Sequence, residues 1–249
     1  MIKFFRRIRK ELLKEGKVKS YLTYAVGEIF LVVIGILIAL QINNNNERAK
    51  ERKKELAFLK EINLDFKSNK AQLDSIIKYN EVSLHAGERL SKILTLFDFE
   101  NPKRNESNRH VADSIGYYID LVWRNKSFNP KNGTVEALLN SSSFDLITND
   151  TLRRNLISWK DVLGDYLEEE QLAVKFLYEE YGPWARSTFE PDLDNDPQSV
   201  KALFSKEYRN FTYHRVGDLK NMIDTANSEG IIDMINSIIK LTETDKIDN

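Results

Sequence analysis

The sequence predicts an all-α protein in which one N-terminal transmembrane helix is followed by an elongated helical-bundle ectodomain. Three observations lead to this fold class: an apolar run of membrane-spanning length, two long stripes of apolar residues at helical spacing, and no period-two alternation bounded by hairpin turns. The expected segments are a basic amphipathic cytoplasmic segment at 1–20, the transmembrane helix at 21–42, a long juxtamembrane helix of the ectodomain at 43–97, and further ectodomain helices at 98–249.

The transmembrane helix is predicted by residues 21–42, which read YLTYAVGEIFLVVIGILIALQI and contain a single ionisable residue, Glu28. About 20 mostly apolar residues are needed to cross roughly 30 Å of hydrocarbon, and Tyr21 and Tyr24 stand where interfacial aromatic residues are common. No small-x-small cleavage motif follows the run, which is also longer than the apolar core of an ordinary signal peptide. We therefore expect an uncleaved signal anchor and a single-pass membrane protein.

Charge on either side of this run predicts its orientation. Residues 1–20 carry eight Lys/Arg against two Glu, a net charge of +6, whereas residues 56–249 carry 24 Lys/Arg against 32 Asp/Glu, a net charge of −8. Short basic flanks stay in the cytoplasm. We therefore expect the N-terminus in the cytoplasm, the helix in the inner (cytoplasmic) membrane of a bacterium, and the C-terminal domain in the periplasm. A basic cluster at 48–54 weakens the asymmetry, although nearby Glu residues leave it only +2.

The N-terminal segment mixes apolar and basic residues. At 3.6 residues per turn Phe5, Ile8 and Leu12 share one face, as in a helix that lies on an anionic membrane surface. Five cations of this segment are expected to contact lipid headgroups: Lys3, Arg6, Arg7, Arg9 and Lys10. Nucleic-acid binding is the alternative. Because a basic segment beside a membrane anchor is more often a topology signal, we predict no nucleic-acid partner.

After the transmembrane run, apolar residues recur every three or four positions, and no proline occurs before Pro102. Between Leu59 and Phe97, eight of the twelve positions at this spacing are apolar, which predicts an amphipathic helix. The other four positions are polar or small: Asn69, Asn80, Ser83 and Gly87. They argue against a long uninterrupted coiled coil, and any break in the helix is expected near 85–87.

Turn and capping residues define the elements that follow. Residues 100–108 form a polar loop, a helix is expected over 110–124, and the Pro, Asn and Gly residues of 128–133 indicate a turn. Thr134 can cap a short helix at 135–139.

The second long helix begins after residues 148–150, which supply a cap and early negative charge. It carries an apolar stripe from Leu152 to Trp184 and is expected to end around Gly182-Pro183 or shortly after. An acidic loop and two further helices complete the expected bundle, at 190–197, near 199–208 and at 216–241.

Glu28 is the strongest candidate for a functional side chain. A charged group at the centre of a bilayer costs ~2.5–3.5 kcal/mol, and such residues usually face protein or water. At 100° per residue, Glu28, Gly35 and Ala39 lie within about 20° of one another. A carboxylate and two small residues on one face are typical of a helix–helix interface. The alternative is that Glu28 handles protons in an ion-driven complex, since this layout is similar to the single-span subunits of proton-driven stators.

No motif predicts catalysis, a cofactor or a metal site. Asp192, Asp194 and Asp196 have the alternate spacing of a calcium loop, but Pro197 stands where that loop needs glycine. The three histidines are far apart in the sequence, and no nucleotide-binding, hydrolase or metalloprotease motif occurs in it. Acidic residues at 168–170 are expected on a solvated helix face, and tryptophans at this spacing are more often core than pocket.

The chain resembles a family of bacterial membrane proteins of unknown function. The similarity lies in YAVGE at 24–28, VIGILIALQINN at 33–44, and a later stretch that runs from GTVEALL at 133–139 to LRRNL at 152–156. One departure is Asn45, where the family usually has tryptophan. The resemblance implies a membrane protein with a helical extracytoplasmic domain, and it implies no activity.

Together these patterns predict a signal-anchored, non-enzymatic interaction or structural module. Its expected partners are the lipid bilayer and, through the transmembrane helix, another copy of the chain or a second membrane protein. The alternative is an accessory subunit of an ion-driven or transport complex that uses the carboxylate of Glu28. An enzyme would need several convergent polar side chains around a concave site, which the sequence does not reveal.

Overall fold

The computed structural model of the chain describes residues 18–96, 114–190, 196–228 and 230–243. Within these residues all regular secondary structure is helical, which confirms the all-α prediction. The chain divides into two compact units, Met1–Leu56 and Ala57–Asn249. Helix α2 (Val18–Leu96) supplies residues to both units. The second unit also contains these elements: α5 (Ile115–Val122), α6 (Gly133–Leu139), the 3₁₀-helix η1 (Ser142–Leu146), α7 (Asp150–Lys175), the π-helix η2 (Phe176–Tyr181), α8 (Gly182–Thr188), α9 (Pro197–Leu203), α10 (Lys206–Ser228) and α11 (Ile231–Leu241).

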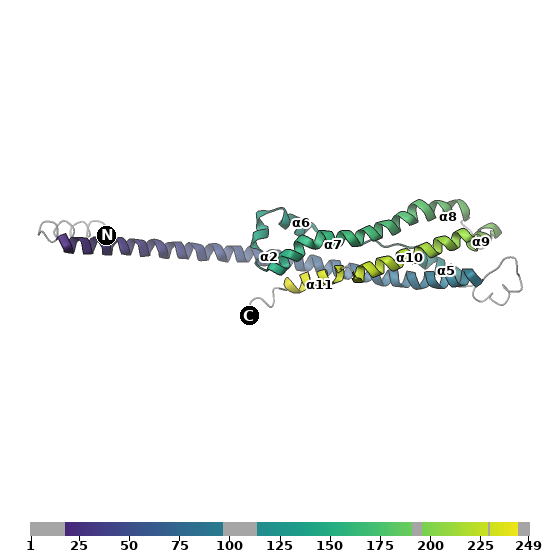
Figure 1. Cartoon of the computed structure of the whole chain (residues 1–249), viewed down its shortest axis with the longest axis horizontal. Helices are drawn as coiled ribbons and strands as arrows, with labels where there is room; N and C mark the ends of the chain where they lie inside the picture. Colours follow the sequence, from purple (N-terminus) through teal and green to yellow (C-terminus); the bar gives the residue numbers. More distant parts are fainter. Residues whose placement is uncertain (1–17, 97–113, 191–195, 229, 244–249) are drawn as a thin grey trace. The chain divides into compact units, whose positions relative to one another are not determined.

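Three long helical stretches form the bundle of the second unit, and Figure 1 shows α7 beside α10 and α11. Phe66 of α2 packs edge-on against Trp159 near the start of α7, with ring centroids 4.9 Å apart. Further along the chain, Leu94 of α2 and Trp184 of α8, which follows α7 and η2, pack in one hydrophobic cluster. This part of α2 and the stretch from α7 to α8 therefore run in the same direction. The α10–α11 stretch runs in the opposite direction, because Tyr208 at its start packs in that same cluster.

The apolar stripe predicted for α2 forms one wall of the core. Each position of the stripe from Leu59 to Leu94 is buried, including the four that are polar or small. The break expected near 85–87 is absent, because α2 is one continuous helix. Gly87 instead permits a close approach between helices: a Cβ at this position would lie 2.7 Å from Cγ2 of Val216 on α10.

The second long helix, which was expected to end around Gly182-Pro183 or shortly after, stays helical through Pro183. A π-helix precedes Gly182, whose N–H donates to the carbonyl of Leu177 five residues earlier. Pro183 lies in the first turn of α8, where its missing N–H costs no intrahelical bond. A Cβ on Gly182 would lie 2.8 Å from the Leu177 oxygen, so glycine suits this turn. The π-helix therefore lets the chain remain helical to Thr188.

The last predicted helices have different boundaries in the structure. The region expected to be one helix over 216–241 is divided by Gly230, which has a φ of 84° in the left-handed region that favours glycine. Before the break, Met222 belongs to the buried stripe of α10 and Ile223 is half-buried. After the break, Ile235 is buried and its neighbour Met234 is half-buried. The helix expected near 199–208 is likewise interrupted, between the end of α9 and the start of α10.

Helix caps agree only in part with the expectations from sequence. The side chain of Asn149 accepts a hydrogen bond from the N–H of Leu152 at 2.9 Å, which confirms the cap predicted for the second long helix. Helix α6 is preceded by Asn132, and Thr134 is not its cap. The Thr134 hydroxyl instead donates to the carboxylate of Asp65 on α2 at 2.6 Å, and this bond links α6 to the start of the bundle.

Candidate functional site

Helix α2 contains an apolar stretch that nothing in the described chain covers. It is long and apolar enough, by length and composition, to cross a membrane, and none of its apolar window is buried. Its large apolar side chains between residues 22 and 42 are 45–66% exposed, except for Ile34, which is half-buried. In the helices of the second unit, by contrast, the apolar stripes are buried in the core.

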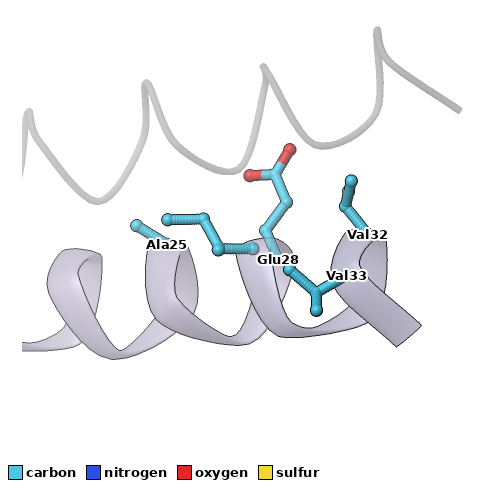
Figure 2. A pocket seen from close by; sticks show the side chains of 5 residues that line it. Ala25, Glu28, Val32 and Val33 are labelled. Carbon is cyan, nitrogen blue, oxygen red and sulfur yellow. The ribbon is translucent and has the colours of Figure 1, made fainter. Parts of the chain in front are cut away.

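The predicted group Glu28, Gly35 and Ala39 lies on this stretch. Glu28 projects from the side of α2 that also carries Ala25 and Val32 (Figure 2). It contributes to two small pockets, one with Ala25, Ile29, Val32 and Val33, and one with Tyr24, Gly27, Phe30 and Leu31. Gly35 and Ala39 are exposed, and a Cβ placed on Gly35 would meet no atom within 4 Å. The backbone at Gly35 is thus open to close approach by another helix.

The five N-terminal cations that were expected to contact lipid, Lys3 to Lys10, lie outside the described residues. Beyond the apolar stretch, α2 carries a second set of charges. Lys50 donates to Glu47 at 2.8 Å, and this hydrogen bond holds the pKa of the Glu47 carboxyl below its ordinary value. Further along α2, Arg52 forms an ion pair with Glu55.

In the second unit, residues 123–132 form a segment without regular secondary structure, to which side chains of the long helices bind. Asn69 of α2 both donates to the carbonyl of Lys131, at 3.1 Å, and accepts from its N–H, at 2.7 Å. Trp159 of α7 donates to the side chain of Asn132 at 2.9 Å. The two bonds between Asn69 and Lys131 satisfy main-chain groups that have no helix partner.

Arg215 of α10 holds the start of this segment and is fully buried. Its Nε donates to the carbonyl of Val122 at 3.1 Å, and its Nη2 donates to the carbonyl of Arg124 at 2.8 Å. A cation at this place also suits the negative end of the α5 dipole. Burial lowers the pKa of Arg215 to about 10, and the guanidinium is therefore largely charged at neutral pH. Its role is to anchor the fold.

Glu170 corrects one prediction from sequence. Residues 168–170 were expected on a solvated face, but Glu170 is buried and both of its carboxylate oxygens accept from the N–H of Phe128, at 3.0 and 3.1 Å. Burial raises its pKa above the ordinary value for glutamate. The signal was present in the sequence, because Glu170 occupies a position of the buried stripe of α7.

Glu170→Gln is expected to remove a pH dependence of stability. A carboxyl whose pKa is raised by folding stabilises the folded state below its unfolded pKa, and this contribution is lost as pH rises through the folded pKa. The amide oxygen of glutamine can still accept from Phe128. Urea unfolding of the detergent-solubilised chain should show the variant gaining stability relative to wild type between pH 4 and 7. The exposed Glu168→Gln is the matched control; equal pH profiles for both variants would contradict the assignment.

Trp159 is a core residue, and Trp123 and Trp184 are half-buried against the core, as the sequence favoured. Trp123 stacks on Tyr181 with ring centroids 3.5 Å apart and donates to the hydroxyl of Tyr208 at 2.9 Å. Trp184 packs against the hydrophobic cluster that contains Leu94 and Tyr208, and Trp159 packs against Phe66. These contacts fill the bundle and leave the indoles engaged in structural roles.

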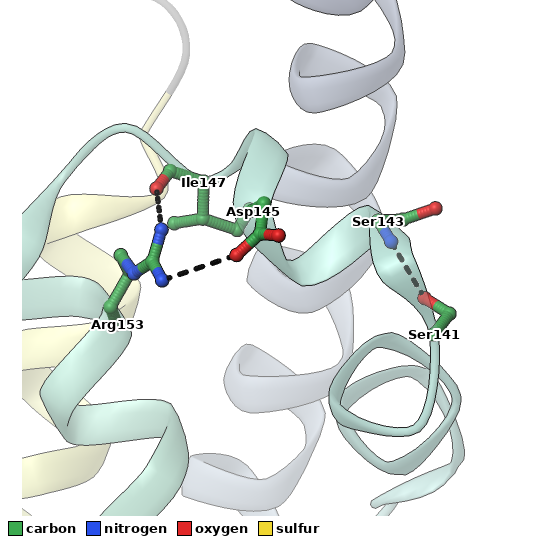
Figure 3. Close-up of polar contacts among 5 residues, drawn as sticks. All are labelled: Ser141, Ser143, Asp145, Ile147 and Arg153. Atoms are coloured by element: carbon green, nitrogen blue, oxygen red, sulfur yellow. Dashed lines mark hydrogen bonds and ion pairs between the residues drawn. The ribbon is translucent and has the colours of Figure 1, made fainter.

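The turn between α6 and α7 is also held by structural contacts. Figure 3 shows Arg153 reaching the carbonyl of Ile147 and the carboxylate of Asp145, each at 3.5 Å. The N–H of Ser143 donates to the hydroxyl of Ser141 at 3.2 Å. Because the Asp145 side chain is 84% exposed, this ion pair lies at the surface and adds little stability.

The described histidines and acids do not form a metal centre. His85 and His214 each lie beside an acid on their own helix, Glu88 at 3.7 Å and Asp218 at 3.3 Å. Among the described residues, no three His, Asp or Glu side chains are grouped so as to hold an ion. His110, Asp192 and Asp194 lie outside the described residues, and Asp196 caps α9 by accepting from the N–H of Ser199 at 2.7 Å.

Comparison with known proteins places the chain in a family. The model of a family of unknown function, DUF6090, matches residues 28–156, more than half of the chain. The chain belongs to the DUF6090 family. No curated protein and no solved structure matches it. The DUF6090 match begins at Glu28, includes Gly35 and Ala39, and extends through the 123–132 segment to Leu156 near the start of α7.

Proposed function

We propose that the chain is a single-pass, signal-anchored membrane protein that serves as a non-enzymatic interaction or structural module. The observation that carries this proposal is the uncovered apolar stretch of α2. An exposed apolar surface of this extent is an aggregation hazard in water, whereas lipid would bury every side of the helix at once. The span is the anchor, and the helical second unit is the part that meets a partner outside the bilayer.

The charges flanking the span support an orientation with the N-terminus in the cytoplasm. The net charge of +6 over residues 1–20 marks the cytoplasmic side, so the second unit lies in the periplasm of a bacterial cell.

The orientation can be tested with cysteine labelling, because the sequence contains no cysteine. The variant Asn227→Cys places one thiol on the exposed surface of α10. A membrane-impermeant maleimide should label it in intact spheroplasts, and the protein should stay in the membrane after carbonate extraction. Labelling only after lysis would reverse the proposed orientation, and release by carbonate would rule out the anchor.

Three observations support an interaction face on the span. Glu28, Gly35 and Ala39 lie on one side of α2, Gly35 is open to close approach, and small residues allow helix backbones to meet in lipid. We propose that this face packs against a helix of another membrane-embedded chain. A photo-crosslinking amino acid at Gly35, used in the native host, should yield adducts with protein. Adducts with lipid alone would contradict a protein interface.

Glu28→Gln separates this packing role from the alternative role in an ion-driven complex. Glutamine keeps the size and hydrogen-bonding capacity of the side chain but cannot exchange a proton at physiological pH. A packing role predicts that crosslinking at Gly35 changes by less than about twofold, and that growth of the host under the condition requiring the protein is unchanged. Loss of that phenotype with crosslinking intact would instead favour the accessory-subunit function.

The polar groups of the second unit support a non-enzymatic role. Arg215, Glu170 and Asn69 are buried and bind the main chain of residues 122–131. These groups are used to hold the fold, and so they are not poised around a substrate-sized cavity.

A further inference from the structure

The face of α2 that carries Glu28, Gly35 and Ala39 continues beyond the apolar stretch. Asn46 follows Glu28 by five full turns at 3.6 residues per turn, and Lys50 and Lys53 lie within about 40° of the same line. Asn46, Lys50 and Lys53 are exposed and belong to the first unit of the chain, as does the apolar stretch. One continuous helix face therefore runs from the apolar stretch into a charged segment.

The charged part of this face is cationic. Lys50 is paired with Glu47, which stands to one side of the face, and the Lys50 side chain is still 68% exposed. Lys53 is exposed and forms no ion pair within the described part of α2. The acids Glu51 and Glu55 lie on the opposite side of the helix, at about 140–180° from Glu28. Beyond the apolar stretch, the face thus carries the positive charges of Lys50 and Lys53 and no acid of its own.

Lys50 and Lys53 could attract negative charge on either lipid headgroups or a protein. Their distance from the hydrocarbon core decides between the two. If hydrocarbon ends near Ile42, Lys50 and Lys53 lie about 12 and 16 Å beyond it along the helix, at 1.5 Å per residue. The headgroup layer on each side is only about 5–8 Å thick. The Cα of Lys53 therefore stands about twice as far out as the layer reaches, and a partner that meets this lysine must be a protein.

Self-association along the whole face is disfavoured by the same charges. A parallel, symmetric pair of this chain would place Lys53 against Lys53, with both Lys50 side chains close by. Like charges at such a seam oppose pairing and are a common means of rejecting a wrong partner. A second copy is therefore a poor occupant of the face outside the span.

We propose that this face binds a helix of a different membrane protein, which packs on Gly35 and Ala39 inside the bilayer and presents carboxylates to Lys50 and Lys53 outside it. The proposal rests on the membrane anchor and interaction face proposed above, and it adds the chemistry of the partner. Small residues allow close packing in lipid, and the charges outside select the partner and its register.

The test uses the full chain in native membranes with a photo-crosslinking amino acid at Ala49, which lies at the edge of the face, and at Glu51 as an off-face control. Adducts with a different protein are expected at Ala49 and absent at Glu51. Lys53→Glu should lower the yield at Ala49 about three- to tenfold, because it replaces attraction by repulsion. Arg48→Glu, an equal change in charge on the opposite side, should leave it unchanged. Raising NaCl from 50 to 500 mM should also lower the yield.

Three outcomes would overturn the acidic partner: self-adducts at Ala49, lipid adducts at Ala49, or equal effects of Lys53→Glu and Arg48→Glu. Crosslinking at Gly35 is measured in the same membranes. It distinguishes a wrong assignment of the acidic partner from a wrong assignment of the interaction face proposed above. Protein adducts at Gly35 together with any of the three outcomes would refute only the acidic partner. Lipid adducts at both positions would refute the interaction face itself.

Discussion

Replacing Arg215 with alanine is expected to lower the free energy of unfolding of the helical second unit by about 3–5 kcal/mol. The guanidinium is fully buried and donates to the carbonyls of Val122 and Arg124, which lie 93 and 91 residues away in the sequence. Alanine would leave a cavity and would remove the donors of two main-chain carbonyls. The end of α5 and the start of the 123–132 segment would lose their attachment to α10.

Two further variants separate the volume of Arg215 from its hydrogen bonds. Arg215→Met fills most of the space and should cost about 1–3 kcal/mol, the value for leaving buried polar groups unsatisfied. Arg215→Lys keeps the charge, but its single ammonium lacks the planar fork that reaches both carbonyls. The control is Arg209→Ala at an exposed position of the same helix. Urea unfolding followed by circular dichroism should rank alanine as the most destabilising change at 215. Equal midpoints for Arg215→Ala and Arg209→Ala would contradict the anchoring role.

The long helices could be predicted from the sequence because their signal is local. The stripes of α2 and α7 depend on spacing alone, and tertiary packing buries them as the spacing indicates. The phase of α10 and α11 was harder to predict because one residue, Gly230, adopts a left-handed conformation and resets the helix. Pro183 indicated a nearby helix end without fixing the last residue, because the π-helix before Gly182 accommodates the proline and the chain stays helical to Thr188.

Contacts between distant segments could not be predicted in the same way. Asn69 appeared as a polar interruption of the α2 stripe, yet it is buried because it pairs with the main chain of Lys131, 62 residues later. Glu170 looked like part of a charged surface because its neighbours in sequence are acids, and its partner Phe128 lies in the 123–132 segment, 42 residues away. A buried polar residue is recognisable only when the group that satisfies it is known.

The candidate face on the apolar stretch, unlike these contacts, could be predicted from the sequence. Glu28, Gly35 and Ala39 lie on one helix, so the known pitch of that helix places them together without tertiary information. The structure adds that this stretch is uncovered within the described chain and that the backbone at Gly35 is accessible. The same reasoning extends to Lys50 and Lys53, where the face leaves the apolar region.

Gly87→Ala is expected to lower the free energy of unfolding by up to about 2 kcal/mol, although alanine is the better helix former. Replacing glycine by alanine inside a helix contributes about 1 kcal/mol of stability when the added methyl group meets nothing. At Gly87 the methyl carbon would lie 2.7 Å from Cγ2 of Val216 and 3.6 Å from Cγ2 of Val122. Overpacking of this kind costs about 1–3 kcal/mol, since a valine side chain is stiff and the helices must separate.

Gly164 of α7 provides the matched control, because a Cβ there would meet no atom within 4 Å. Gly164→Ala should therefore raise the free energy of unfolding by about 1 kcal/mol, so the two substitutions should have opposite signs. Val216→Ala makes room for the methyl group, and a double-mutant cycle should show a favourable coupling between Gly87→Ala and Val216→Ala. If both glycine variants gain stability and the cycle shows no coupling, α2 and α10 do not meet at Gly87.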